Sequence, residues 1–438
     1  MGLGPNGGGL YADLIADARG NLFGATIFGG TNNRGTVFEI AKTASGYSSA
    51  PSTLVSFNGA NGAAPYSFAG LIADASGNLL GTTERGGASN QGTVFMIAKT
   101  AGGYSSAPVI LVSFNGSNGR IPYAGLIADA NGNLFGTTSG GGANNQGTVF
   151  MIAKTAGGYA SEPVTLVSFN GANGAAPFAS LLADANGNLF GATTGGGASG
   201  LGTVFMIVKT TGGYSSAPVT LVSFNGANGA LPRSVLIADA SGNLFGTTDG
   251  GTTEGGSAIN KGTVFMIAKT AGGYASAPIT LVSFNGANGL APFAGLIADA
   301  KGNLFGTTKF GGANNQGTVF MIAKIASGYA SAPATLVSFN YTNGLAPFAG
   351  LIADANGNLF GTTVGGGANN QGTVFKITDS GFVVPPTFAG TPGQANCHGK
   401  SVAGLAKQYG GLNTAAYKLG FSSAMQLQGA IKGFCEKT

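Results

Sequence analysis

One segment recurs seven times along this 438-residue chain, and that repetition limits the possible folds more than any other feature. Each copy carries a close variant of L-I-A-D-x-x-G-N-L-F-G-T-T, then a Gly/Asn-rich loop, then G-T-V-F-M-I-A-K-T. The copies are spaced by 57, 55, 55, 55, 60 and 55 residues, measured between the aspartates Asp17, Asp74, Asp129, Asp184, Asp239, Asp299 and Asp354. A period of this length indicates units that fold alike and pack against their neighbours.

Each unit is expected to hold four strands, because runs rich in Val, Ile, Phe and Thr alternate with Gly, Asn, Asp and Pro clusters. In the third copy these strands are Ala124–Asp129, Asn133–Thr138, Gly147–Thr155 and Val164–Phe169. Phe150 and Ile152 point to one face of the third strand and Val149 and Met151 to the other, so both faces are apolar. Such a sheet must be covered on both sides. We therefore predict an all-β fold, a seven-bladed β-propeller of four-stranded blades, rather than a β-solenoid with shorter rungs.

One blade is expected to be incomplete. The strand that ends in L-V-S-F occurs six times, with its last residue at Phe57, Phe114, Phe169, Phe224, Phe284 and Phe339. No seventh copy follows G-T-V-F-K-I at residues 372–377, and Pro385 and Pro386 prevent a ladder strand there. The last blade should therefore lack a strand or be completed by residues outside this sequence.

The composition changes near residue 385. We expect the propeller over residues 1–384, a linker over 385–396 and a small all-α domain over 397–438, with helices Ser401–Tyr409, Asn413–Leu419 and Ser422–Phe434 that begin at N-caps. Cys397 and Cys435, the chain's two cysteines, bracket this domain. A disulfide between them would contribute about 4 kcal/mol in the chain-entropy model and implies an oxidising compartment. A reactive Cys397–His398 pair is disfavoured, because adjacent residues rarely align for nucleophile activation.

The repeated phrases also resemble a known family. G-N-L-F-G-T-T, G-G-A-N-N-Q-G-T-V-F and L-V-S-F-N-G are similar to the Gloeo/Verruco tandem repeats of bacterial proteins, over about residues 10–380. The D-x-x-G-N-L-F-G-T phrase is more loosely similar to propeller repeats of sensor ectodomains, and the tail to a helical C-terminal module of secreted bacterial proteins. These resemblances imply a secreted, periplasmic or cell-surface protein. They carry over no activity and no catalytic residue.

Charge and hydropathy exclude several partners. The chain has a formal net charge of +5, but residues 385–438 hold five lysines against one acidic residue, so the repeats are almost neutral. Nucleic-acid binding requires a basic stripe, which a near-neutral ring does not offer. No run of 18 apolar residues predicts a transmembrane helix. The first residues show no signal peptide, and we expect a monomer.

The acidic residues point to turns rather than to catalysis or metal binding. The D-x-x-G-N motif resembles a calcium loop, but Arg19 and Lys301 occupy its third position in two copies, and a cation cannot ligate Ca²⁺. The seven aspartates are therefore assigned to hairpin turns, and we expect no metal and no cofactor. Acid–base catalysis usually needs His or paired carboxylates, whereas the single histidine, His398, lies in the tail. We expect no enzymatic activity.

A binding face is expected where the copies differ. The two residues after G-T-T vary and must share one face of a ring, and insertions in repeat proteins also tend to lie on the binding face. The candidate ligand-binding residues are Phe28, Glu84, Arg85, Asp249, Lys309 and Phe310, with Glu254 in the insertion of the fifth copy and the loop amides Asn144, Asn145, Asn314 and Asn315. Drift in a permissive loop is the alternative interpretation. The lysine that ends G-T-V-F-M-I-A-K is interpreted as a solvated strand end rather than one of a ring of ligand-binding cations.

These observations favour a non-enzymatic extracytoplasmic binding propeller that recognises a glycan or envelope component, or a protein partner, through one loop face. The first alternative is a structural or display protein without a ligand pocket. The second is a lyase-like propeller enzyme, which the shortage of His and carboxylates disfavours.

Overall fold

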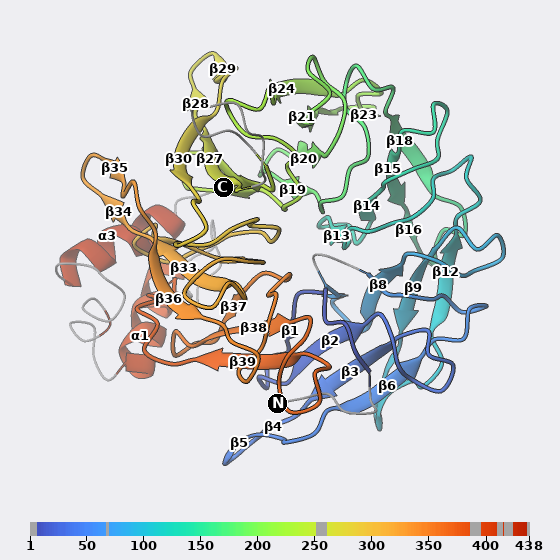
Figure 1. Ribbon diagram of the computed structural model, residues 1–438, viewed down its shortest axis with the longest axis horizontal. Coiled ribbons are helices and arrows are strands. Elements are labelled where there is room, and N and C mark those ends of the chain that lie inside the picture. Colours follow the sequence, from blue (N-terminus) through green and yellow to red (C-terminus); the bar gives the residue numbers. More distant parts are fainter. Residues whose placement is uncertain are drawn as a thin grey trace. The chain divides into compact units, whose positions relative to one another are not determined.

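The computed structural model describes residues 7–66, 70–250, 261–385, 396–409, 415 and 424–435. The chain forms two compact units, which are described separately (Figure 1). The first unit comprises Met1–Ile297, Phe305–Ile352 and Phe360–Lys376; the second comprises Ala298–Leu304, Ala353–Leu359 and Ile377–Thr438. The boundaries 1–384, 385–396 and 397–438 remain a prediction.

The repeats form a seven-bladed β-propeller, as the sequence predicts, with antiparallel sheets arranged around an axis (Figure 1). The short first strands are β1 (Ile15–Ala16), β7 (Ile72–Ala73), β13 (Ile127–Ala128), β19 (Leu182–Ala183), β25 (Ile237–Ala238), β31 (Ile297–Ala298) and β37 (Ile352–Ala353). The second strands, buried along their length, are β2 (Leu22–Thr26), β8 (Leu79–Thr83), β14 (Leu134–Thr138), β20 (Leu189–Thr193), β26 (Leu244–Thr248), β32 (Leu304–Thr308) and β38 (Leu359–Thr363).

The outer half of each sheet is built from the third and fourth strands. The third strands are β3 (Thr36–Ile40), β9 (Thr93–Ile97), β15 (Thr148–Ile152), β21 (Thr203–Ile207), β27 (Thr263–Ile267), β33 (Thr318–Ile322) and β39 (Thr373–Ile377). The fourth strands are β6 (Ser52–Ser56), β12 (Val109–Ser113), β18 (Val164–Ser168), β24 (Val219–Ser223), β30 (Ile279–Ser283) and β36 (Ala334–Ser338). In the described residues the seventh sheet has three strands, β37, β38 and β39.

The predicted third strand, Gly147–Thr155, is wrong at its C-terminal end, because β15 stops at Ile152. The Asn133 side chain accepts a hydrogen bond from Lys154 N (2.9 Å), and the chain leaves the sheet there. A two-stranded hairpin follows in six repeats: β4–β5 (Lys42–Thr43, Gly46–Tyr47), β10–β11 (Lys99–Thr100, Gly103–Tyr104), β16–β17 (Lys154–Thr155, Gly158–Tyr159), β22–β23 (Lys209–Thr210, Gly213–Tyr214), β28–β29 (Lys269–Thr270, Gly273–Tyr274) and β34–β35 (Lys324–Ile325, Gly328–Tyr329).

The turn between the first two strands is held by its aspartate. Asp129 Oδ1 accepts hydrogen bonds from the backbone N–H groups of Asn131 (3.0 Å) and Asn133 (2.9 Å), and Oδ2 accepts one from Asn133 Nδ2 (2.9 Å). Gly132 takes the left-handed conformation that this turn requires, with a φ of 81°. The same carboxylate bonds recur in the other six repeats.

The core lies between blades, where the faces of neighbouring sheets meet. Phe169, at the end of one blade, packs edge-on against Phe205 of the next with ring centroids 5.1 Å apart. Within a blade, the ring of Phe150 lies over Gly136 of the paired strand, and a Cβ on Gly136 would come within 2.6 Å of Phe150 Cζ. The glycine of G-N-L-F-G-T therefore makes room for the phenylalanine of G-T-V-F.

The ring closes where the first blade meets the seventh. Leu10, Leu14 and Phe38 pack with Phe360 of the last blade in one buried cluster. Asp13, next to Leu14 in the chain, is partly buried, and its carboxylate accepts a hydrogen bond from Gly350 N (2.5 Å). Burial raises the pKa of Asp13 from 3.8 to about 7, although the Gly350 hydrogen bond opposes the rise.

The second unit contains α1 (Cys397–Tyr409) and α3 (Ala424–Cys435), joined by the predicted disulfide between Cys397 and Cys435. α1 begins four residues before the predicted start at Ser401, whose side chain is buried rather than capping the helix. Leu405, Ala415, Leu427 and Ile431 form the core of this part. The predicted helix Asn413–Leu419 lies outside the described residues, apart from Ala415. No helix in the described part of the chain is long and apolar enough to cross a membrane.

Replacing Gly136 by alanine should lower the free energy of unfolding by about 1–3 kcal/mol, because the added methyl group overpacks the Phe150 ring. Gly157→Ala is the matched control, since nothing lies within 4 Å of a Cβ at Gly157. Urea unfolding followed by circular dichroism measures both variants. Equal midpoints for the two variants would contradict this account of the packing.

Asp13→Asn should change how stability depends on pH. The unfolded carboxyl group ionises near 3.8 and the folded one near 7, so the wild type should lose stability as pH rises from about 4 to 7, by about 4 kcal/mol. Asparagine keeps an acceptor for Gly350 N without a charge, so the variant should melt at a higher temperature than wild type at pH 8. Melting curves from pH 4 to 8 measure this, with Asp379→Asn as an exposed control. A variant as pH-dependent as wild type would refute the assignment.

Candidate functional site

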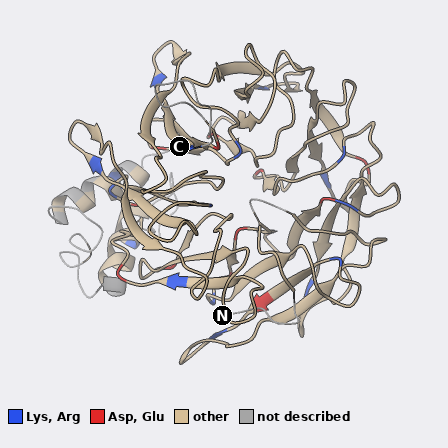
Figure 2. Ribbon diagram, viewed as in Figure 1, with Lys and Arg blue, Asp and Glu red and all other residues tan. Residues whose placement is uncertain are grey.

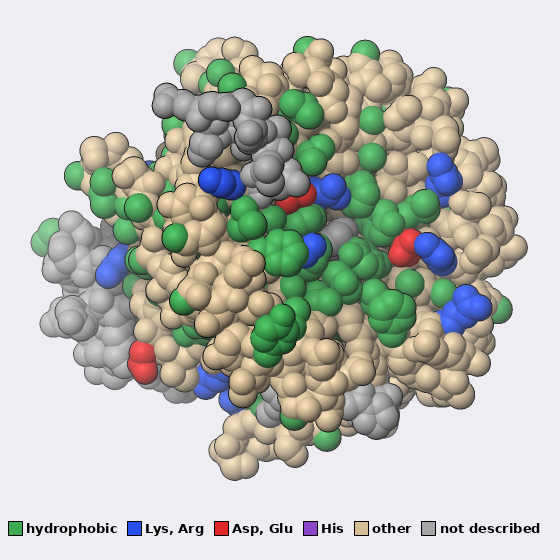
Figure 3. Space-filling model, in the orientation of Figure 1, with side chains coloured by type: hydrophobic (Ala, Val, Ile, Leu, Met, Phe, Trp, Pro, Cys, Tyr) green, Lys and Arg blue, Asp and Glu red, His purple; other side chains and the backbone are tan. Residues whose placement is uncertain are grey.

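A closed ring of side chains surrounds the propeller axis at one face. Each blade contributes one residue from the segment before its first strand, and we call these residues the collar: Tyr11, Tyr66, Tyr123, Phe178, Arg233, Phe293 and Phe348. Figure 3 shows hydrophobic side chains gathered at the centre of this face, with a few basic and acidic side chains among them.

Contacts between neighbouring collar residues run around the whole ring. Ring centroids are 4.5 Å apart for Tyr11–Tyr66, 5.4 Å for Tyr66–Tyr123 and 4.7 Å for the stacked pair Tyr123–Phe178. Across the other half, Phe293–Phe348 and Phe348–Tyr11 are 4.6 Å and 4.9 Å apart. The guanidinium carbon of Arg233 fills the remaining gap, 5.1 Å from the Phe178 centroid and 5.3 Å from that of Phe293. Because each contact joins two blades, the collar encircles the axis.

Strained backbone holds the collar in place. In six repeats the collar residue follows a proline, and the non-glycine residue before that proline has a left-handed φ of 49° to 58°. Ile121 is the extreme case, because a β-branched side chain strongly disfavours its φ of 58°. Its N–H donates to Gln91 O (2.9 Å) and its carbonyl accepts from Ser139 N (3.0 Å), so two loops fix the strained residue. Strain of this kind, costing about 1–3 kcal/mol, clusters at functional sites.

Most collar side chains are half-buried, so a ligand can reach part of their surface; Phe348 is more deeply buried. Burial raises the pKa of Tyr11, of Tyr66 and of Tyr123, and the nearby Glu84 carboxylate raises that of Tyr123 further. The hydroxyl groups therefore stay protonated at physiological pH. The collar combines aromatic surface with neutral hydrogen-bonding groups.

Three of the residues predicted from the variable pairs lie against the collar. Glu84 Oε1 is 3.4 Å from the hydroxyl group of Tyr123, which donates to it. Asp249 Oδ2 is 3.3 Å from Arg233 Nε. Lys309 Nζ lies 4.5 Å from the ring centroid of Phe348. In these three blades, the first residue of the variable pair therefore contacts a collar residue.

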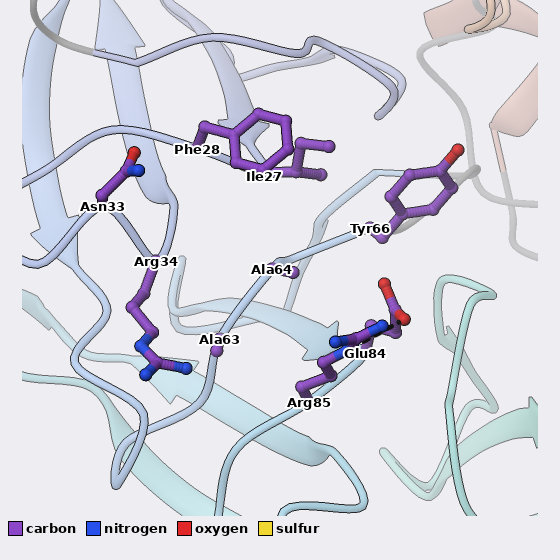
Figure 4. A pocket seen from close by; sticks show the side chains of 9 residues that line it. All are labelled: Ile27, Phe28, Asn33, Arg34, Ala63, Ala64, Tyr66, Glu84 and Arg85. Atoms are coloured by element: carbon purple, nitrogen blue, oxygen red, sulfur yellow. Dashed lines mark hydrogen bonds and ion pairs between the residues drawn. The ribbon is translucent and has the colours of Figure 1, made fainter.

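The second residues of the pairs lie farther out. Phe28 and Phe310 are exposed, by 55% and 39%. Arg85 pairs with Glu84 at 3.1 Å. Phe28 and Arg85 line a pocket of about 320 Å³ between the first two blades, together with Ile27, Asn33, Arg34, Ala63, Ala64, Tyr66 and Glu84. In Figure 4, Phe28 and Ile27 lie on one side of this pocket, and Arg34 and Arg85 lie on the other.

The predicted loop amides form hydrogen bonds with other parts of the propeller. Asn145 and Asn315 have left-handed φ values, and their Oδ1 atoms accept from Gly141 N and Gly311 N, each at 3.1 Å. Asn144 and Asn314 donate from Nδ2 to the carbonyl oxygens of Phe169 and Phe339, each at 3.2 Å. Asn145 also accepts from Arg120 Nε at 3.1 Å. Glu254 and its insertion lie outside the described residues.

The strand-end lysines do not surround the axis. In each hairpin the lysine Nζ lies over the ring of the paired tyrosine, for example 3.8 Å from the Tyr159 centroid for Lys154. The hairpins point outward from the ring (Figure 1). These lysines therefore form six separate cation–π contacts at the rim.

Charge near the collar is predominantly positive, on a chain with few charged residues (Figure 2). Among the described residues, the loops and collar segments of this face carry three carboxylates outside the turns, Asp13, Glu84 and Asp249. They carry more cations: Arg34, Arg85, Arg120, Arg233, Lys261 and Lys309. Burial raises the pKa of Asp249, while Arg233 and Lys309 oppose the rise. No group of three or more His, Cys, Asp or Glu residues able to hold a metal ion occurs in the part that the structure describes.

Sequence reasoning missed the collar itself. In six copies a proline precedes a large side chain, which is Tyr, Phe or Arg, shortly before the first strand. The large side chain stands six residues before the turn aspartate, except in the second copy, where Tyr66 stands eight residues before Asp74. The proline followed by a large side chain was the available signal.

A family model, described as the Gloeobacter/Verrucomicrobia repeat, matches residues 3–163, 110–275 and 250–424. The chain belongs to this repeat family. The resemblance noted in the repeated phrases is therefore confirmed. No curated protein sequence gives a match.

Among solved structures, the repeat protein is similar to the crystal structure of a putative 6-phosphogluconolactonase from Bacteroides uniformis. The two are 14% identical with a TM-score of 0.51, and the match covers 84% of this chain and 93% of the other. A likeness at this identity supports the propeller fold alone.

Proposed function

We propose that this protein is a non-enzymatic, extracytoplasmic binding propeller that holds a glycan at the collar. The observation that carries the proposal is the collar itself: a continuous ring of aromatic and guanidinium groups, most of them half-buried, held by strained backbone. Aromatic faces supply large apolar contact areas with a defined geometry, which suits the C–H faces of sugar rings. The hydroxyl groups of Tyr11, Tyr66 and Tyr123 supply neutral donors and acceptors for sugar hydroxyl groups.

Binding is favoured over catalysis by how the carboxylates are used. Glu84 is paired with Arg85, and Asp249 lies against Arg233, so each contacts a cation of its own. A glycosidase or lyase needs two groups of matched pKa facing one substrate bond. The lactonase name of the structural neighbour supports no such assignment for this chain.

The disulfide Cys397–Cys435 supports a location outside the cytoplasm, because such bonds persist in oxidising compartments. Weak net charge and a large share of glycine suit an extracellular scaffold as well. We propose that the protein acts as a monomer, with the collar face turned toward its ligand.

Phe178→Ala should weaken glycan binding roughly tenfold or more, because it removes the ring that stacks on Tyr123 and supports Arg233. The measurement is a glycan array followed by isothermal titration with the strongest hit. Tyr341→Ala is the matched control, an aromatic residue exposed by 66% outside the collar. Lys309→Ala/Phe310→Ala tests the neighbouring variable pair.

Equal loss in Phe178→Ala and Tyr341→Ala would place the ligand elsewhere. No binding across the array by the wild type would sink the glycan proposal and favour a structural or display role, or a protein partner.

A further inference from the structure

The collar is aromatic at every described position except one. Arg233 occupies the place that belongs to Phe178, Phe293 and Phe348 in sister repeats, in the phrase A-L-P-R-S-V instead of A-A-P-F-A-S. Its guanidinium group lies between the two neighbouring rings, 5.1 Å and 5.3 Å from their centroids. The substitution therefore keeps the stacking and adds a charge.

The guanidinium group of Arg233 has few polar contacts among the described residues. Arg233 Nε lies 3.3 Å from Asp249 Oδ2, but it is buried and makes no hydrogen bond with the part of the chain that the structure describes. The side chain of Asp249 is only 13% exposed, and that of Arg233 is 26% exposed. A guanidinium group offers five donors in a planar fork, and among the described residues the ion pair with Asp249 uses only part of that capacity.

A second cation lies next to the same ring. Lys309 Nζ is 5.2 Å from the Phe293 centroid, 4.6 Å from that of Phe310 and 4.5 Å from that of Phe348. Burial lowers the pKa of Lys309, and the positive charge of Arg233 lowers it further, while Asp249 opposes this. Ile27 and Val364 occupy the same place in two sister repeats, so this charge is also particular to one sector.

Among the described residues, the two cations share one carboxylate, Asp249, which leaves a net positive charge on these three groups. It is only partly exposed to water, which strengthens its attraction for an anion. Both cations contact the partly buried ring of Phe293, which brings them to the same part of the collar.

We propose that Arg233 and Lys309 form an anion-binding subsite of the collar, so that the ligand is an acidic glycan whose carboxylate or sulfate lies between them. This inference rests on the proposed glycan function and specifies its ligand class. The guanidinium fork matches the planar geometry of a carboxylate, and the ammonium group of Lys309 supplies a second positive charge.

The test compares uronic-acid oligosaccharides with their carboxyl-reduced neutral counterparts, which differ only in the charged group. Sulfated oligosaccharides and their desulfated forms make a second pair and distinguish the two sources of negative charge. The wild type should bind the acidic member of a pair roughly tenfold more tightly, as expected for one charge-assisted contact. This preference should shrink as NaCl is raised.

Arg233→Phe restores the residue of the sister repeats and keeps the collar aromatic. It should bring the ratio of the affinities for the acidic and the neutral member to about one, and Lys309→Val should lower this ratio in the same direction. Lys269→Ala, at a rim hairpin, is the control and should retain the preference. Thermal melting checks that each variant is folded.

Equal affinity of the wild type for both members of every pair, or a preference that survives Arg233→Phe, overturns this inference and leaves glycan binding standing. Failure of the wild type to bind any oligosaccharide, neutral or acidic, overturns the glycan function itself.

Discussion

The propeller depends on one packing contact that is made seven times, in which a phenylalanine ring lies over a glycine on the neighbouring strand. Phe150 over Gly136 is the example in the third blade, and the equivalent glycines are Gly24, Gly81, Gly191, Gly246, Gly306 and Gly361. Because the glycine has no Cβ, the phenylalanine ring lies close against its own sheet. The next blade packs against the apolar face that results. This contact explains why so glycine-rich a chain still builds a tightly packed core.

Much of the fold could be predicted from the sequence, because repetition averages out the ambiguity of any single strand. The number of blades, the four-strand unit and the short seventh sheet all follow from the pattern. The hairpins after the third strands were missed, because Lys154-Thr155 continues a run of strand-forming residues. What ends the strand is the Asn133 side chain, which binds Lys154 N across 21 positions of sequence. Sequence patterns of period two carry no information on such a contact.

The candidate site could be predicted only in part. Variation after G-T-T pointed to Glu84, Asp249 and Lys309, which do lie at the collar, because a loop at an equivalent position of each blade must share a face. The collar residues themselves vary between Tyr, Phe and Arg, and their contacts join different blades. That these residues contact one another can be seen only in the folded propeller. The amides Asn144 and Asn145 show the converse: side chains that would suit a ligand are hydrogen-bonded to the protein's own backbone.

One arginine among the collar residues has a geometrical consequence. Seven nearly identical blades produce a frame that looks almost the same after each step of rotation about its axis. A ligand lying across a uniform ring could settle in any of seven equivalent orientations. Arg233 marks one blade, and this lifts the rotational degeneracy. For the proposed glycan, a contact with Arg233 would single out one of these orientations, so a nearly symmetric scaffold would give its ligand a defined polarity.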